Sequence, residues 1–153
     1  MSLDATGLFS AITSHADALG LFDGVNGHEP KNAPGNGLSA AVWVESIGPV
    51  NSSGLASTSA AVTFSVRIYS SFIQKPEDGI DINILHATDA LMNEYSGDYE
   101  LGSALNVRCV DLLGQAGTPL NARAGYQTID DKIYRVMTIT LPLIVNDVWD
   151  QVA

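Results

Sequence analysis

The chain has 153 residues, of which 46% are hydrophobic and 16% charged, and its formal net charge at pH 7 is −10. A chain of this length folds as one ordinary domain around a single core, and this composition is too apolar for disorder. No apolar run approaches the roughly 18 residues of a membrane helix, so we expect no membrane contact. The acidic surface repels phosphate, which argues against sequence-specific binding to nucleic acid.

The first segment predicts a helix over residues 4–19. Leu8, Ile12 and Leu19 recur at helical spacing, Asp4 can accept from the first free backbone amides, and Gly20 can end the helix. The segment has acids and no basic first region, so we read no export signal and expect synthesis in a cytoplasm. Residues 23–37 are rich in glycine, proline and asparagine and predict a loop.

The middle of the chain predicts strands over 39–47 and 60–73. Residues 48–59 between them are small and polar, which indicates a long hairpin loop. In the second strand Val62, Phe64 and Val66 alternate with polar residues, so we expect one buried face of the sheet. The period then changes to that of an amphipathic helix over 77–96.

Three further strands are predicted over 104–113, 122–129 and 132–142, with Asp130 and Asp131 able to turn the last pair into a hairpin. Pro142 cannot donate to a sheet ladder, so we expect regular pairing to end there or at a sheet edge. This order predicts a single-domain α+β fold: a mostly antiparallel four- or five-stranded sheet with helices packed on one face.

The sequence contains no nucleophile-and-base motif, no metal-ligand spacing and no phosphate-binding loop, so we predict no catalytic residues, no cofactor and no metal site. Cys109 is the only cysteine and reads as a small core residue. His86 and Asp89 can share a helix face, but two ligands are too few for a transition metal. We expect them on an exposed face.

Five residues are candidates for a subunit interface. Arg67, Arg108 and Arg135 fall mid-strand among apolar neighbours, where they either lie on an exposed strand face or meet acids of a second copy. Val148 and Trp149 follow the last predicted strand, where they either fold back as a lid or pack on a neighbour, tryptophan being enriched at binding hot spots.

Several stretches together resemble the tail terminator (tail-completion) proteins of long-tailed bacteriophages, the siphophages. After the first helix come "NGHEPKNAPGNGLSAAVWV" and "FSVRIYSSF", then the amphipathic helix and the closing "YRVMTITLPLIVNDVW". The pieces "VRIYSSF" and "LPLIVND" are the most family-like. The resemblance spans nearly the whole chain and rests on layout and phrasing, without a catalytic signature.

This resemblance implies a non-enzymatic virion protein, assembled in the host bacterial cytoplasm. Such proteins form a ring, typically of six copies, that caps the tail tube, stops its polymerisation and offers a surface to the head. The implied partners are copies of itself, the major tail tube protein and a head-completion or connector protein, with DNA passing through the ring.

Three alternatives stay open. The first is a head-side neck or connector protein. The second is a monomeric small-ligand module in which Trp43, Tyr69 and Trp149 line a pocket. The third is an acid-dependent hydrolase whose carboxylates the sequence does not pair.

Overall fold

The computed structural model describes residues 3–31, 37–50, 57–71, 78–98 and 106–150. Within these ranges it shows two helices and six strands. In chain order they are α1 (Ala5–Leu19), β1 (Val25–Asn26), β2 (Ser39–Pro49), β3 (Ser57–Ser71), α2 (Gly79–Gly97), β4 (Val107–Val110), β5 (Asn121–Ile129) and β6 (Lys132–Asp150).

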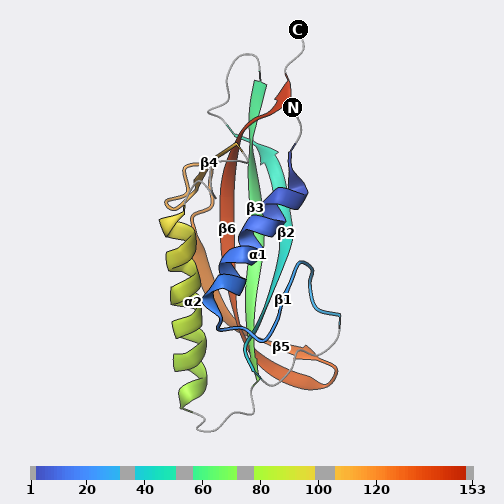
Figure 1. Ribbon diagram of the computed structural model, residues 1–153, viewed down its shortest axis with the longest axis vertical. Coiled ribbons are helices and arrows are strands. Elements are labelled where there is room, and N and C mark those ends of the chain that lie inside the picture. Colours follow the sequence, from blue (N-terminus) through green and yellow to red (C-terminus); the bar gives the residue numbers. More distant parts are fainter. Residues whose placement is uncertain (1–2, 32–36, 51–56, 72–77, 99–105, 151–153) are drawn as a thin grey trace.

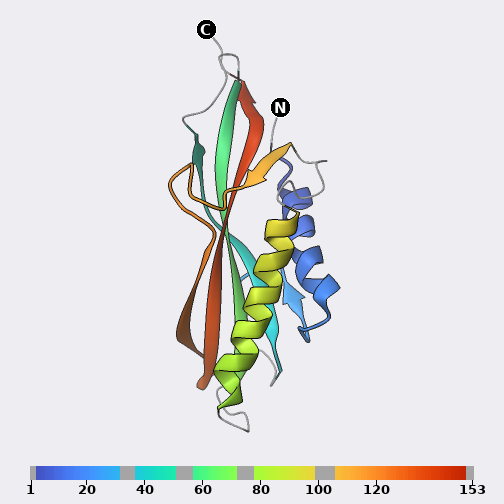
Figure 2. The same cartoon turned by 90° about the vertical axis from the view of Figure 1, so that its left-hand side faces the viewer.

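The strands form one sheet in the order β1, β2, β3, β6, β4, and β5 also pairs with β6. Every pair is antiparallel except the short parallel pair of β1 and β2. Both helices lie on the same face of this long, twisted sheet (Figures 1 and 2). The predicted α+β architecture is confirmed, with six strands in place of four or five, because the loop prediction for 23–37 missed β1.

Several predicted bounds were wrong at the hairpins. β2 continues to Pro49 and β3 begins at Ser57, so the connection between them is shorter than the predicted 48–59, and its residues 51–56 lie outside the described chain. β4 covers only residues 107–110 of the predicted 104–113, because the chain turns away from β6 after Asp111. Positions 72–73, 77 and 104–105 of the predicted elements also lie outside the described residues.

The largest correction concerns Pro142, where the last strand does not end. β6 runs on for eight residues to Asp150, and its residues 143–145, 149 and 150 pair with β3 on either side of a bulge. The Pro142 carbonyl accepts from the backbone N–H of Asp111, so its nitrogen points to that same side. An N–H at position 142 would have met the Asp111 carbonyl, which accepts from Leu120 instead. Because the Asp111 carbonyl already has a donor, the missing N–H of Pro142 leaves no acceptor of the neighbouring chain without a hydrogen bond at this position.

The core lies between the helices and the sheet. Alternate residues of β3 and β6 face the helices as the alternation predicts, and α1 contributes Leu8 and Ile12. The rings of Phe9 and Phe64 meet edge to face with centroids 5.1 Å apart. The opposite face of the sheet is not wholly exposed, because a second, smaller cluster buries Ala41, Tyr69, Tyr134 and Val136.

Helix ends follow ordinary capping chemistry at α1. The Asp4 carboxylate accepts from the backbone N–H of Gly7 at 3.0 Å, and Gly20 ends the helix with φ +67°.

The two helices are joined by Tyr95 of α2, which is fully buried and donates its hydroxyl to the Ile12 carbonyl at 3.1 Å. Burial raises the pKa of Tyr95 far above its ordinary value.

We expect Tyr95→Phe to lower the free energy of unfolding by about 1 kcal/mol near neutral pH, because one buried hydrogen bond is lost. Above pH 10 the unfolded chain releases the phenol proton while the folded chain keeps it, so wild-type stability falls as the pH rises. Tyr95→Phe should show a shallower fall. Urea unfolding at pH 8 and pH 11 measures both effects.

The control is Tyr126→Phe, because the Tyr126 side chain is 62% exposed. Equal loss of stability at alkaline pH in wild type and Tyr95→Phe would contradict the assignment. Some alkaline loss is expected to remain in Tyr95→Phe, since burial also raises the pKa of Tyr69.

Candidate functional site

Arg67 lies on the sheet face opposite the helices, among neutral partners. Its Nε donates to Thr138 Oγ1 at 2.8 Å and its Nη1 to Gln127 Oε1 at 3.4 Å. The guanidinium carbon lies 5.1 Å from the centroid of the Trp43 ring. Arg67 also lowers the pKa of Tyr69, against the larger rise that burial causes. This arginine therefore organises its own sheet face.

Arg135 and Arg108 likewise have partners in their own chain. Arg135 Nε lies 2.9 Å from the Asp81 carboxylate at the start of α2, and its guanidinium stacks 4.5 Å from the Tyr126 ring centroid. Arg108 Nε donates to Asn146 Oδ1 at 2.7 Å. Because Asp81 is 71% exposed, its ion pair contributes little stability. The interface role of the three arginines stays a prediction.

Val148 and Trp149 occupy different environments at the end of β6. Val148 is 2% exposed and belongs to the main core, whereas Trp149 is 39% exposed and pairs with Thr58. Thr58 and Tyr69 lie at opposite ends of β3. The structure therefore does not bring Trp43, Tyr69 and Trp149 into one pocket, contrary to the ligand-module hypothesis.

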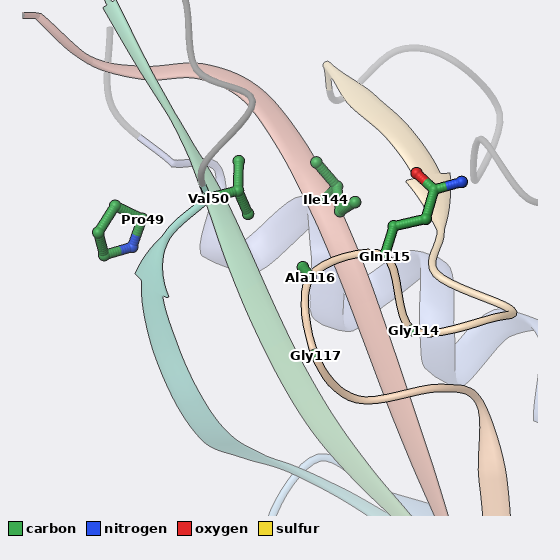
Figure 3. A pocket seen from close by; sticks show the side chains of 7 residues that line it. All are labelled: Pro49, Val50, Gly114, Gln115, Ala116, Gly117 and Ile144. Carbon is green, nitrogen blue, oxygen red and sulfur yellow. The ribbon is translucent and has the colours of Figure 1, made fainter.

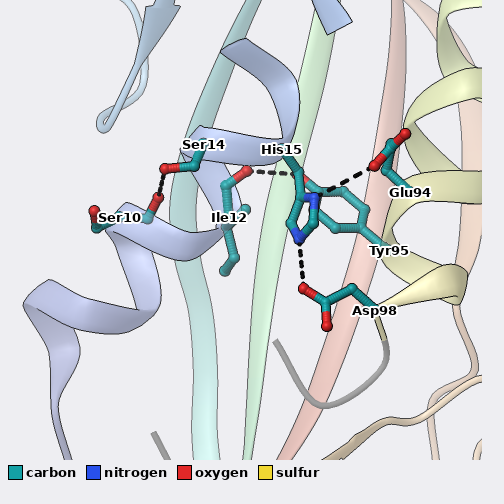
Figure 4. Close-up of polar contacts among 7 residues, drawn as sticks. All are labelled: Ser10, Ile12, Ser14, His15, Glu94, Tyr95 and Asp98. Atoms are coloured by element: carbon teal, nitrogen blue, oxygen red, sulfur yellow. Dashed lines mark hydrogen bonds and ion pairs between the residues drawn. The ribbon is translucent and has the colours of Figure 1, made fainter. Parts of the chain in front are cut away.

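His15 forms a polar cluster between the helices that the sequence did not reveal (Figure 4). Its Nε2 lies 3.0 Å from Asp98 Oδ2 and its Nδ1 3.6 Å from Glu94 Oε2. The ring also meets Tyr95 edge to face. Asp98 is 83 residues from His15 in the sequence, so no local spacing indicates this pair. The cluster ties α1 to the end of α2.

Other reactive groups are separate in the structure. The described residues contain no group of three or more side chains that could hold a metal ion, and His86 and Asp89 are exposed as predicted. Burial raises the pKa of the half-buried Cys109 thiol, with a smaller contribution from the nearby Asp111. Such a thiol is a poor nucleophile at neutral pH. Neither described helix is long and apolar enough to span a bilayer.

Residues 111–120 between β4 and β5 form a compact turn, here called the Asp111 loop. Asp111 is 2% exposed, and its two carboxylate oxygens accept from the backbone N–H groups of Gln115 at 2.7 Å and Ala116 at 2.9 Å. The backbone N–H of Asp111 donates to the Pro142 carbonyl, and the Asp111 carbonyl accepts from the N–H of Leu120. One buried residue thus fixes both ends and the middle of the loop.

Glycine and proline complete the Asp111 loop. Gly114 has φ +80°, and a Cβ there would lie 3.1 Å from the nitrogen of Pro119, so a larger residue would be strained at this position. Gly117 donates its N–H back to the Gly114 carbonyl at 3.0 Å. In the sequence, Gly114, Gly117 and Pro119 indicate a turn. The strand prediction nevertheless ran to residue 113, because Leu112 and Leu113 are apolar.

A pocket of about 420 Å³ opens between the Asp111 loop and the end of β2 (Figure 3). Residues 114–117 line one side, Pro49 and Val50 another, and Ile144 of β6 completes the lining. None of these residues is charged. The pocket therefore offers an uncharged surface to which polar groups, such as the Gln115 amide, and apolar groups contribute about equally. It has no side chain for acid-base chemistry.

No family model matches the sequence, and no curated protein matches it significantly. Among solved structures, the chain is similar to a sheath/tube terminator of an extracellular contractile injection system, PVC, in its extended state. The identity is 8% and the TM-score 0.46, with all of this chain covered and 62% of the other. The chain thus spans less than two thirds of that neighbour's length, and the likeness is too low to support an inference about function.

We expect Asp111→Asn to lower the free energy of unfolding by about 2 kcal/mol, because a buried charged acceptor of two N–H groups is replaced by a neutral amide with one oxygen. The amides of Gln115 and Ala116 should also exchange with solvent faster. Hydrogen exchange measured by NMR and urea unfolding test this. Asp89→Asn, at an exposed position on α2, is the matched control. Unchanged exchange at residues 115 and 116 would contradict the bracing role.

Proposed function

We propose that this protein is a tail terminator of a long-tailed phage: it forms a ring, typically of six copies, that caps the tail tube, ends its polymerisation and joins the head. The position of the family-like sequence supports this most strongly. Residues 66–71 of "VRIYSSF" lie on β3 and "LPLIVND" lies on β6, and these two strands are paired at the centre of the sheet. The resemblance therefore lies in the strands that define the fold.

The two unlike faces of the sheet suit a geometric mechanism. Both helices cover one face, while the other face is formed by the strands and the Asp111 loop (Figures 2 and 3). One surface of such a ring can match the contact that a tube subunit offers, and the opposite surface does not repeat it. No further tube subunit can then add. This mechanism requires no bond to be made or broken.

The charge of the chain suits a ring through which DNA passes. Its 17 acids exceed its 7 lysines and arginines, so an acidic lining of the hole would avoid the phosphate attraction that basic residues create. The proposed partners are copies of the chain, the major tail tube protein and a head-completion protein. The proposal involves no cofactor and no membrane.

Deletion of the gene from the phage that carries it tests this function. We expect tails of uncontrolled length that do not join heads, measured by negative-stain electron microscopy of the lysate. A plasmid copy of the wild type should restore normal particles, and so should Asp89→Asn as a surface control. Tails of normal length without heads would instead assign the protein to the head side of the neck. Normal particles without the gene would exclude both roles.

A further inference from the structure

Leu112 and Leu113 are held outside the fold by a rigid support. The Leu113 side chain is 88% exposed and that of Leu112 is 40% exposed. They follow Asp111 directly, and the hydrogen bonds of its carboxylate and backbone fix the loop on both sides. A side chain presented by an ordered loop loses little conformational entropy on binding. The two leucines can therefore bind a surface of another molecule at a low cost in conformational entropy.

The same loop forms one wall of the 420 Å³ pocket. The other lining residues are Pro49 at the end of β2, Val50 directly after it, and Ile144 of β6. Leu112 and Leu113 are not among the lining residues, so one chain carries both an apolar projection and a separate uncharged recess. Two such complementary but different surfaces on one molecule make a head-to-tail contact, which closes into a ring when the rotation between copies allows it.

Charge favours a second copy as the occupant. Each chain carries −10, so copies repel one another wherever their acids meet. Residues 112–122 contain no charged side chain, and neither does the pocket lining. Arg67, Arg108 and Arg135, by contrast, already have partners in their own chain. An uncharged projection entering an uncharged pocket brings like-charged chains together with no acid buried in the contact.

We propose that Leu112 and Leu113 of one copy insert into the pocket of the next copy, and that this contact repeats around the ring. The inference deepens the proposed function, on which it rests, by naming the contact that closes the ring. Because the donor and acceptor surfaces differ, each can be removed separately. The contact can therefore be tested by complementation.

Two variants isolate the two halves of the contact. Leu113→Ser removes the projection and leaves the pocket, and at an 88% exposed position it should barely change stability. Ala116→Trp fills the pocket and leaves the projection, with room for the larger side chain because Ala116 is exposed. Leu85→Ser, which alters another exposed leucine outside the loop, and Ala116→Ser are the matched controls.

Native mass spectrometry and sedimentation velocity over a concentration series give the readout. We expect the wild type and both controls to form closed oligomers of 16.1 kDa chains. Leu113→Ser and Ala116→Trp should each associate at least about tenfold more weakly. An equimolar mixture of the two should form a dimer with one chain of each kind and nothing larger, because only one complementary contact remains.

Three results would overturn the inference: a wild type that stays monomeric at every concentration, a Leu113→Ser variant that assembles like the wild type, or a mixture without the mixed dimer. These outcomes are distinguishable from failure of the proposed function. If rings form through another surface, the proposed leucine contact is rejected, and the tail-length experiment still decides the function. If tails are normal without the gene, the proposed function is rejected, and the measured contact between copies still stands.

Discussion

A single strand, β6, pairs with two different strands along its outer edge, and the rest of the structure depends on how it changes from one to the other. β5 pairs as far as Thr140 and β4 begins at Leu143. Pro142 stands at this change of partner and needs no acceptor for an N–H. Asp111 donates to the Pro142 carbonyl and accepts from Leu120, so both of its backbone groups stay paired where the chain leaves β4 and turns towards β5.

This arrangement links the core to the surface. The inner edge of β6 pairs with β3 along nearly its whole length, and their alternate residues carry both helices. The same Asp111 that joins β4 to β6 also holds the loop whose leucines project from the sheet. The proposed ring contact needs a support that does not move when a second copy binds, and a loop anchored to the central strand provides one.

The sequence predicted the α+β layout because its signals were local. Alternation along β3, the Asp4 cap and the turn at Asp130 and Asp131 each depend on a few neighbouring residues. The errors arose where distant residues decide the outcome. Pro142 reads as a strand end until Leu120 is seen to take over the Asp111 carbonyl, and no periodicity indicates that exchange.

The candidate site was harder to predict for the same reason. The sequence drew attention to arginines, but Arg67 and Arg135 bind residues of distant strands and of α2 in their own chain. Val148 was expected either to fold back as a lid or to pack on a neighbour, and the structure buries it in the core of its own chain. The partners of His15 on the second helix and the carboxylate at the centre of the Asp111 loop became apparent only once the chain was folded.

β6 is one continuous strand through Pro142, and the frame of the molecule depends on this continuity. Native-state hydrogen exchange, followed residue by residue at increasing denaturant, tests this directly. We predict that buried amides on both sides of the proline, at Ile139 and Val145 for example, exchange through one opening reaction with the free energy of global unfolding. If Val145 and its neighbours opened separately at a much lower free energy, the strand would consist of two independent parts, and the frame described here would be wrong.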